Sequence, residues 1–236
     1  MSPFIAEFIG TAMLMIFGNG VVANVVLNKT LGNNSGWLVI NFGWAMAVFI
    51  GVYISSSYSG AHLNPAVTIA DAIKNSDFSK LWVYLPAQFL GAMTGSSLVY
   101  VIYNEHFNQT EDQSSKLACF CTAPAIPNFK RNFITETIIT FVFVLSIFML
   151  SNNPKSVELG ALSALPVALL VLAMGLCLGG PTGYAINPAR DFGPRLMHFV
   201  LPIKGKGESN WAYAAVPLFA PIVGGILAAL FYKYCF

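Results

Sequence analysis

The chain has 236 residues, of which 56% are hydrophobic and only 9% are charged, and its formal net charge is +2. Soluble domains carry about 25% charged residues, so this composition excludes a protein whose whole surface faces water. The few lysines and arginines are scattered, with no basic block, so no nucleic-acid partner is expected, and membrane lipids are the only partner that the composition requires.

Six apolar segments are each long enough to cross a bilayer, which takes about 20 residues. They lie at about 4–27, 36–58, 81–104, 131–151, 157–179 and 211–235. The first is not a cleavable signal sequence, because it lacks a basic leading region and carries Glu7 inside the apolar run. The sequence therefore predicts an all-α membrane protein in which residues 1–236 form a single domain.

The segments repeat in order. Each half opens with a helix that carries a buried glutamate, Glu7 in "AEFIGTAMLMIFG" and Glu136 in "TETIITFVFVLSI". Three spans per half is an odd number, so the second half must enter the membrane from the opposite side, as in an inverted repeat. The repeats are expected at about 1–104 and 130–236, joined by an extracellular loop at about 105–129.

One short motif also occurs in both halves. "SGAHLNPAVTIA" at 59–70 contains Asn64, Pro65 and Ala66, and "TGYAINPARDFG" at 182–193 contains Asn187, Pro188 and Ala189. Asn is a preferred N-cap, Pro suits the first helical position and Ala favours helix, so each motif predicts a helix start.

The residues that follow each motif, about 67–71 and 190–199, are too few to cross the bilayer. They predict two re-entrant half-helices that begin near the midplane. Non-helical backbone survives at that depth only where it is buried in protein or lines water. The carbonyls before the motifs are therefore expected to line a polar conduit; these belong to Gly60, Ala61, His62, Leu63, Ala185 and Ile186.

With these motifs the chain resembles the major intrinsic proteins, which include aquaporins and aquaglyceroporins, from "AEFIGT" to "PLFAPIVGG". "SGAHLNPAVT" with "GYAINPARDFGPR" is similar to the bacterial glycerol-facilitator branch. The resemblance implies six tilted helices plus two half-helices, one pore per subunit, a homotetramer, and a multi-pass position in a bacterial cell membrane. The asparagine amides would then face the passing solute.

The resemblance also implies a selectivity filter of four residues, Trp44, Gly175, Tyr184 and Arg190. The water-selective branch usually has Phe and His at the first two positions, so Trp and Gly imply a wider and more apolar filter. Arg190 would donate to adjacent hydroxyls of a polyol while the aromatic rings pack its carbon edge. Tyr184 departs from the Phe of the best-known facilitators by a hydroxyl whose direction the sequence leaves open.

The predicted function is a passive channel for glycerol and water, with urea, dihydroxyacetone and undissociated lactic acid as further solutes, that excludes ions and protons. The alternative is a strictly water-selective aquaporin, against which Gly175 argues because nothing at that position fills the space of a His. The sequence shows no nucleophile–base pair, nucleotide loop or metal-ligand spacing, so no enzymatic activity, cofactor or metal is expected.

Buried charges have competing interpretations. Arg190 at membrane depth is assigned to the filter, although pairing with Asp191 is an alternative. Glu7 and Glu136 suit loop anchoring by accepting hydrogen bonds better than a proton relay, and the resemblance gives Asp191 a similar anchoring role. His62 is expected to be structural, with a pH-gating role as the alternative.

The orientation rests on resemblance alone, which places both termini in the cytoplasm. Four lysines would then lie inside and six basic residues outside, so the positive-inside rule does not support it. The inner set is Lys74, Lys80, Lys155 and Lys233, and the outer set is Lys29, Lys116, Lys130, Arg131, Lys204 and Lys206.

Overall fold

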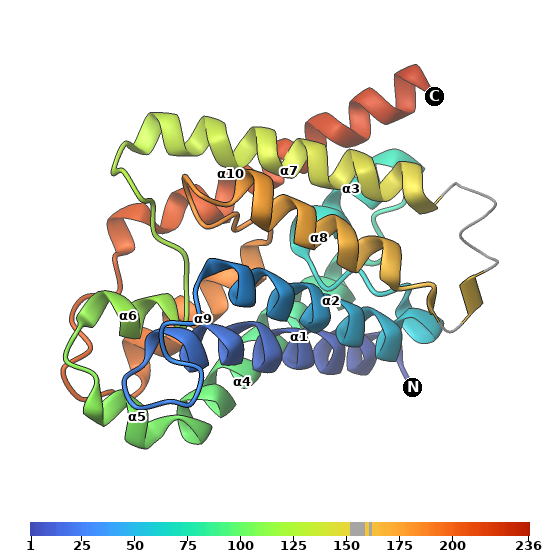
Figure 1. The fold of residues 1–236 in the computed structure, drawn as a ribbon. Helices are drawn as coiled ribbons and strands as arrows, with labels where there is room; N and C mark the ends of the chain where they lie inside the picture. Colours follow the sequence, from blue (N-terminus) through green and yellow to red (C-terminus); the bar gives the residue numbers. More distant parts are fainter. Residues whose placement is uncertain (152–158, 161) are drawn as a thin grey trace.

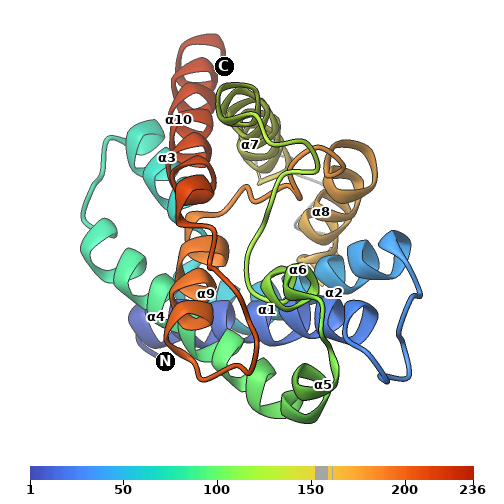
Figure 2. The same cartoon turned by 90° about the vertical axis from the view of Figure 1, so that its left-hand side faces the viewer.

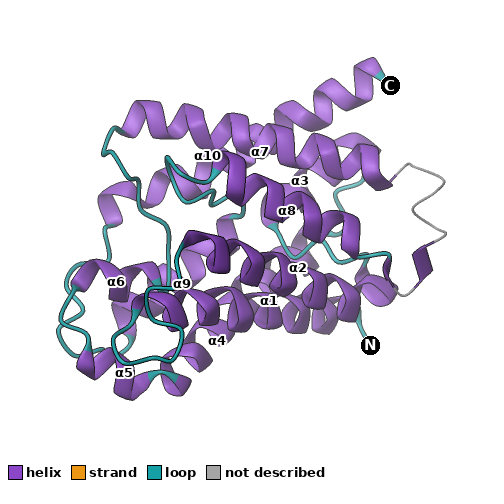
Figure 3. Cartoon of the chain, viewed as in Figure 1, coloured by secondary structure: helices purple, strands orange, loops and turns teal. Residues whose placement is uncertain are grey.

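The computed structural model describes residues 1–151, 159–160 and 162–236, and these residues form α-helices and loops with no strand (Figures 1 and 3). The helices are α1 (Pro3–Val26), α2 (Trp37–Ser59), α3 (Pro65–Asn75), α4 (Leu81–Ile102), α5 (Asn104–Gln109), α6 (Gln113–Ala118), α7 (Phe129–Ser151), α8 (Leu165–Leu178), α9 (Pro188–Val200) and α10 (Trp211–Cys235). The two termini lie toward one end of the bundle, and α5 and α6 lie at the other (Figure 1).

Among the described residues, five helices are long and apolar enough to cross a membrane: α1, α2, α4, α7 and α10. Their large apolar side chains are exposed on the outside of the bundle, as Phe17, Phe42, Leu98 and Ile138 illustrate. Polar groups such as Glu7 are fully buried instead. A surface of this kind is stable only against lipid, so the chain is a multi-pass membrane protein.

The fifth predicted segment, 157–179, is only partly helical in the described chain. Residues 152–158 and 161 lie outside the described residues, and α8 begins at Leu165. Pro166 occupies the first turn of α8, where its missing N–H leaves no hydrogen bond unmade. The 14 residues of α8 are about 21 Å long, so the helix is shorter than the predicted span.

The two predicted half-helices are α3 and α9, and each begins at the proline of its motif, with the asparagine as N-cap, as the motif predicts. With 11 and 13 residues, each is too short to span the bilayer, although the two together are about as long as one span. Both lie alongside α10 (Figure 2).

Helix pairing follows the repeat. In the first half α1 packs on α4, in the second α7 packs on α10, and each half-helix also crosses to the other half, α3 to α10 and α9 to α4. Glycines permit the closest approaches: a Cβ at Gly95 would lie 2.5 Å from the Ala12 carbonyl, and one at Gly225 would lie 2.8 Å from the Ala66 carbonyl. Close packing through small residues is how helices associate in lipid.

The connection at 105–129 contains α5 and α6, neither of which the sequence predicted. Asp112 caps α6, and hydrogen bonds from Ser115 and Ser114 lower the pKa of its carboxyl group to about 2. The buried ammonium of Lys116 donates to the Lys204 carbonyl over 2.5 Å. This contact joins the connection to the loop between α9 and α10.

Candidate functional site

The two Asn-Pro-Ala motifs meet inside the bundle and bond to one another. The Asn64 Oδ1 accepts from the Ala66 N–H at 2.9 Å and caps α3, while its Nδ2 donates to the Ile186 carbonyl at 2.9 Å. Asn187 repeats the pattern, with Oδ1 accepting from Ala189 at 3.0 Å and Nδ2 donating to the Leu63 carbonyl at 2.8 Å. Since an amide NH₂ has two donors, each asparagine keeps one for another partner.

The backbone before each motif has a left-handed conformation that hydrogen bonds to side chains must stabilise. Ala61 and Leu63 have φ of 55° and 49°, and Tyr184 and Ile186 have φ of 37° and 45°. This left-handed region costs a non-glycine residue about 1–2 kcal/mol. The same alternation in both halves means that the two loops share one geometry.

Two buried glutamates hold these loops. Glu7 accepts from the backbone N–H groups of His62 at 3.0 Å and Leu63 at 2.7 Å, from the Ser59 hydroxyl at 2.6 Å and from the Gln88 amide at 2.8 Å.

In the second half, Glu136 accepts from the N–H groups of Ala185 at 2.9 Å and Ile186 at 3.2 Å. Both carboxyl groups are completely buried. These are the contacts that loop anchoring requires.

One cavity of about 340 Å³ extends from Asp71 and Lys74 past both motifs to Trp44 and Arg190. Its lining includes most predicted site residues: Gly60, Ala61, His62, Leu63, Asn64, Ala185, Ile186, Asn187, Trp44, Tyr184 and Arg190. Apolar side chains such as Val48 and Phe143 complete the wall. Pro65, Ala66, Pro188, Ala189 and Gly175 are buried in the surrounding helices.

Arg190 and Trp44 face one another at one end of this cavity. The guanidinium Cζ lies 4.1 Å from the centre of the Trp44 ring, within the range of a cation–π contact. The indole lies against α1 at Gly18, where any Cβ would overlap it. The Arg190 Nη1 is buried and has no hydrogen-bond partner among the described residues. Because Arg190 also lines the cavity, its guanidinium stands where a solute hydroxyl passes.

Tyr184 and Gly175 correct one sequence-based expectation. The space beside Gly175 is not empty, because a Cβ there would overlap Asn41 and lie 2.8 Å from Cζ of Tyr184. The Tyr184 hydroxyl donates to Asn41 Oδ1 over 2.8 Å. The tyrosine that replaces the usual Phe therefore occupies the room that the missing side chain leaves.

Asp191 lies in a buried polar cluster with Arg195 and Thr122. Its Oδ2 accepts from the Thr122 N–H at 2.7 Å and hydroxyl at 2.6 Å, and its Oδ1 accepts from Arg195 Nε at 2.9 Å. Arg195 also donates to the carbonyls of Ser209, Asn210 and Thr122. The cluster joins α9 to the connection at 105–129 and to the loop before α10.

Arg195 and Asn41 were not among the predicted site residues, although the sequence carries a signal for each. Arg195 stands four residues after Asp191 on the same helix face, the spacing of an ion pair. Asn41 is an amide in an apolar span, three residues before Trp44. His198 also has no predicted role, but it is fully buried in α9, with its Nδ1 2.8 Å from the Ser209 hydroxyl.

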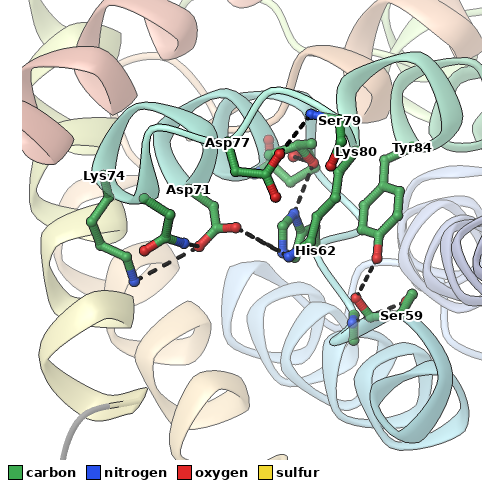
Figure 4. Close-up of polar contacts among 12 residues, drawn as sticks. Ser59, His62, Asp71, Lys74, Asp77, Ser79, Lys80 and Tyr84 are labelled. Carbon is green, nitrogen blue, oxygen red and sulfur yellow. Dashed lines mark hydrogen bonds and ion pairs between the residues drawn. The ribbon is translucent and has the colours of Figure 1, made fainter.

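The opposite end of the cavity carries charged side chains (Figure 4). Asp71 lies 3.8 Å from His62 Nε2, 3.7 Å from the Lys74 ammonium and 3.3 Å from that of Lys80. His62 Nδ1 is 3.2 Å from the Thr68 hydroxyl, and its ring stands edge-on to Tyr84 with centres 5.0 Å apart. His62 is thus fixed on several sides where the cavity opens.

The chain matches known proteins along almost its whole length. The family model described as "Major intrinsic protein" matches residues 1–232. The chain is 51% identical to a probable glycerol uptake facilitator protein of Thermotoga maritima over 237 residues, 100% of each chain. It is 46% identical to the glycerol uptake facilitator protein of Streptococcus pneumoniae, over 99% of each chain. The solved aquaglyceroporin of Plasmodium falciparum superposes with a TM-score of 0.84 at 35% identity, over 98% of this chain and 94% of that one.

Proposed function

The chain belongs to the major intrinsic protein family, and from that premise we propose that it is a passive membrane channel for glycerol and water. One observation carries the proposal: a single cavity of about 340 Å³ touches both Asn-Pro-Ala motifs and reaches the facing side chains of Arg190 and Trp44. The glycerol facilitators at 46–51% identity over nearly their full length support glycerol as the chief solute.

The filter chemistry suits a polyol. Arg190 lines the cavity, and its guanidinium supplies N–H donors that replace the water lost by adjacent hydroxyls. Trp44 and Tyr184 present ring surface to the carbon edge. Gly175 contributes by having no side chain, which leaves room for Tyr184.

Ion exclusion follows from the two half-helices. Both α3 and α9 begin directly after the asparagines that cap them, so their N-terminal partial positive charges lie at the two motifs. The asparagines offer N–H donors to the lumen, and the carbonyls before each motif offer acceptors. Water and glycerol can exchange hydrogen bonds along this path, whereas a cation meets positive potential.

The remaining residues support the pore. We assign loop anchoring to Glu7, Glu136 and Asp191, on the strength of the hydrogen bonds that each accepts. We propose a structural role for His62, since Thr68, Asp71 and Tyr84 surround its ring. We propose that these residues take part in no covalent chemistry and that the protein is a channel and not an enzyme.

At the level of the whole protein, we propose one domain over 1–236, with inverted repeats at about 1–104 and 130–236 joined by the outer connection 105–129. The matching roles of Glu7 and Glu136 support the repeat. Family resemblance supports a homotetramer in a bacterial plasma membrane with both termini in the cytoplasm.

A strictly water-selective channel is the second candidate, and one observation favours it: the Tyr184 ring fills space beside Gly175. Stopped-flow light scattering of proteoliposomes separates the two. The proposal predicts that wild-type protein raises both water and glycerol permeability above those of empty liposomes, with no increase in proton leak. Raised water permeability with glycerol at the empty-liposome level would support the second candidate.

A further inference from the structure

Asn41 is an amide in the apolar helix α2, and its side chain is completely buried. Its Oδ1 accepts a hydrogen bond of 2.8 Å from the hydroxyl of Tyr184, which lies 143 positions later in the chain. Its Nδ2 is buried without a partner among the described residues. Burying a polar group in a membrane span is costly, so a residue that does so is a candidate for function.

A second residue of α2 holds the same ring. The Trp37 Nε1 donates to the Gly175 carbonyl over 3.2 Å, and the Trp37 ring stands edge-on to Tyr184, with centres 6.0 Å apart and planes at 89°. Gly175 itself has no Cβ, and one would overlap Asn41 Oδ1. The hydrogen bond between Asn41 and Tyr184 therefore depends on the glycine between them.

The direction of the tyrosine hydroxyl decides what the solute meets. Tyr184 lines the cavity, while Asn41 is not among the residues that do so. Bonded to Asn41, the hydroxyl is directed to the α2 side of the ring, and ring carbons face the lumen. A hydroxyl released from Asn41 would seek a partner, and the lumen offers water and polyol hydroxyls.

We propose that Asn41 is a positioning residue for selectivity: by accepting a hydrogen bond from the Tyr184 hydroxyl it keeps that group out of the lumen, so that ring carbons of Tyr184 line the cavity. This proposal rests on the proposed glycerol channel and deepens it.

A double-mutant cycle tests the coupling through the glycerol-to-water permeability ratio in proteoliposomes. Asn41→Leu removes the acceptor at similar volume, and Asn41→Ser removes it by shortening the side chain, in case leucine impairs folding. Tyr184→Phe removes the donor but keeps the ring. Asn19→Leu is the matched control, because Asn19 is equally buried, on α1, with neither amide atom bonded among the described residues.

With Tyr184 present, either Asn41 substitution is expected to lower the ratio about three- to tenfold, the size expected for one hydrogen bond. In the Tyr184→Phe background, Asn41→Leu is expected to change the ratio less than about twofold relative to Tyr184→Phe alone, and Asn19→Leu is expected to change the wild-type ratio by no more than that. A purely structural role would lower the ratio equally in both backgrounds.

Equal effects in both backgrounds, or no effect of either Asn41 substitution, would overturn the proposal. A wild type that passes no glycerol would instead contradict the proposed function. The same cycle measured on water permeability would then still report whether Asn41 and Tyr184 are coupled.

Discussion

Gly175 lies in α8, where its backbone packs directly against the side chains of Asn41 and Tyr184. Its importance lies in the two side chains that occupy the space where a Cβ would stand, those of Asn41 and Tyr184. Any substitution must displace one of them, and both lie in a packed interior where displaced atoms have little room. Adding a single methyl group at this position is therefore expected to displace a filter side chain.

Gly175→Ala is expected to lower glycerol permeability several-fold more than water permeability, because the displaced Tyr184 ring enters the slot through which the wider solute passes. Stopped-flow light scattering of proteoliposomes measures both. Gly180→Ala is the control, since a Cβ at Gly180 would meet nothing within 4 Å. Equal loss in the two alanine variants would argue against a role for Gly175 in the filter.

At the scale of elements, the half-helices α3 and α9 depend on loops whose backbone is strained. Ala61 and Leu63 keep positive φ because the neighbouring N–H groups point at Glu7. The start of α3 was predictable from sequence, since capping by Asn64 is local chemistry. The four donors around Glu7 come from residues 52 to 81 positions away, and no local pattern reveals them.

Glu7→Gln is expected to destabilise the protein by about 1–3 kcal/mol, because an amide NH₂ replaces one acceptor oxygen and faces donors in a buried site. Thermal unfolding in detergent and water permeability should both decline. Glu105→Gln, at an exposed position of α5, serves as the control. Unchanged stability and permeability in Glu7→Gln would refute the anchoring role.

The Asp191–Arg195 pair, whose side chains are 1% and 0% exposed, holds α9 to two loops. Asp191→Ala is expected to cost about 3–5 kcal/mol, because the guanidinium is left buried without its charge partner. The double variant Asp191→Ala with Arg195→Leu should recover part of that loss. Unfolding temperatures in detergent, with the exposed Asp77→Ala as reference, measure both; a double variant less stable than Asp191→Ala would contradict this view of the pair.

For the whole molecule, most of the architecture could be predicted from the sequence, because composition, span length and the repeated motif all constrain it. The start of α8 at Leu165 and the folding of the connection into α5 and α6 were not predicted from the sequence. The sequence shows Asn41 as an amide in an apolar span and Tyr184 as a predicted filter residue. Their hydrogen bond could not be predicted, because it depends on the packing of α2 on α8.

Cysteine labelling tests the orientation of the whole chain. In a Cys177→Ser variant, Cys235 is the one exposed thiol of the remaining three, because Cys119 and Cys121 are buried and burial raises the pKa of both. A membrane-impermeant maleimide should leave Cys235 unlabelled in intact cells and label it after permeabilisation. Labelling of Cys235 in intact cells would place the C-terminus outside.

The central claim is that glycerol passes through the cavity between the two motifs, with its hydroxyls on Arg190 and its carbon edge on Trp44. The most direct measurement is an experimental structure determined in the presence of glycerol. The account predicts glycerol in the cavity, with adjacent hydroxyls within hydrogen-bond distance of the Arg190 guanidinium. A cavity that holds only water at saturating glycerol, with the Tyr184 hydroxyl turned into the lumen, would contradict it.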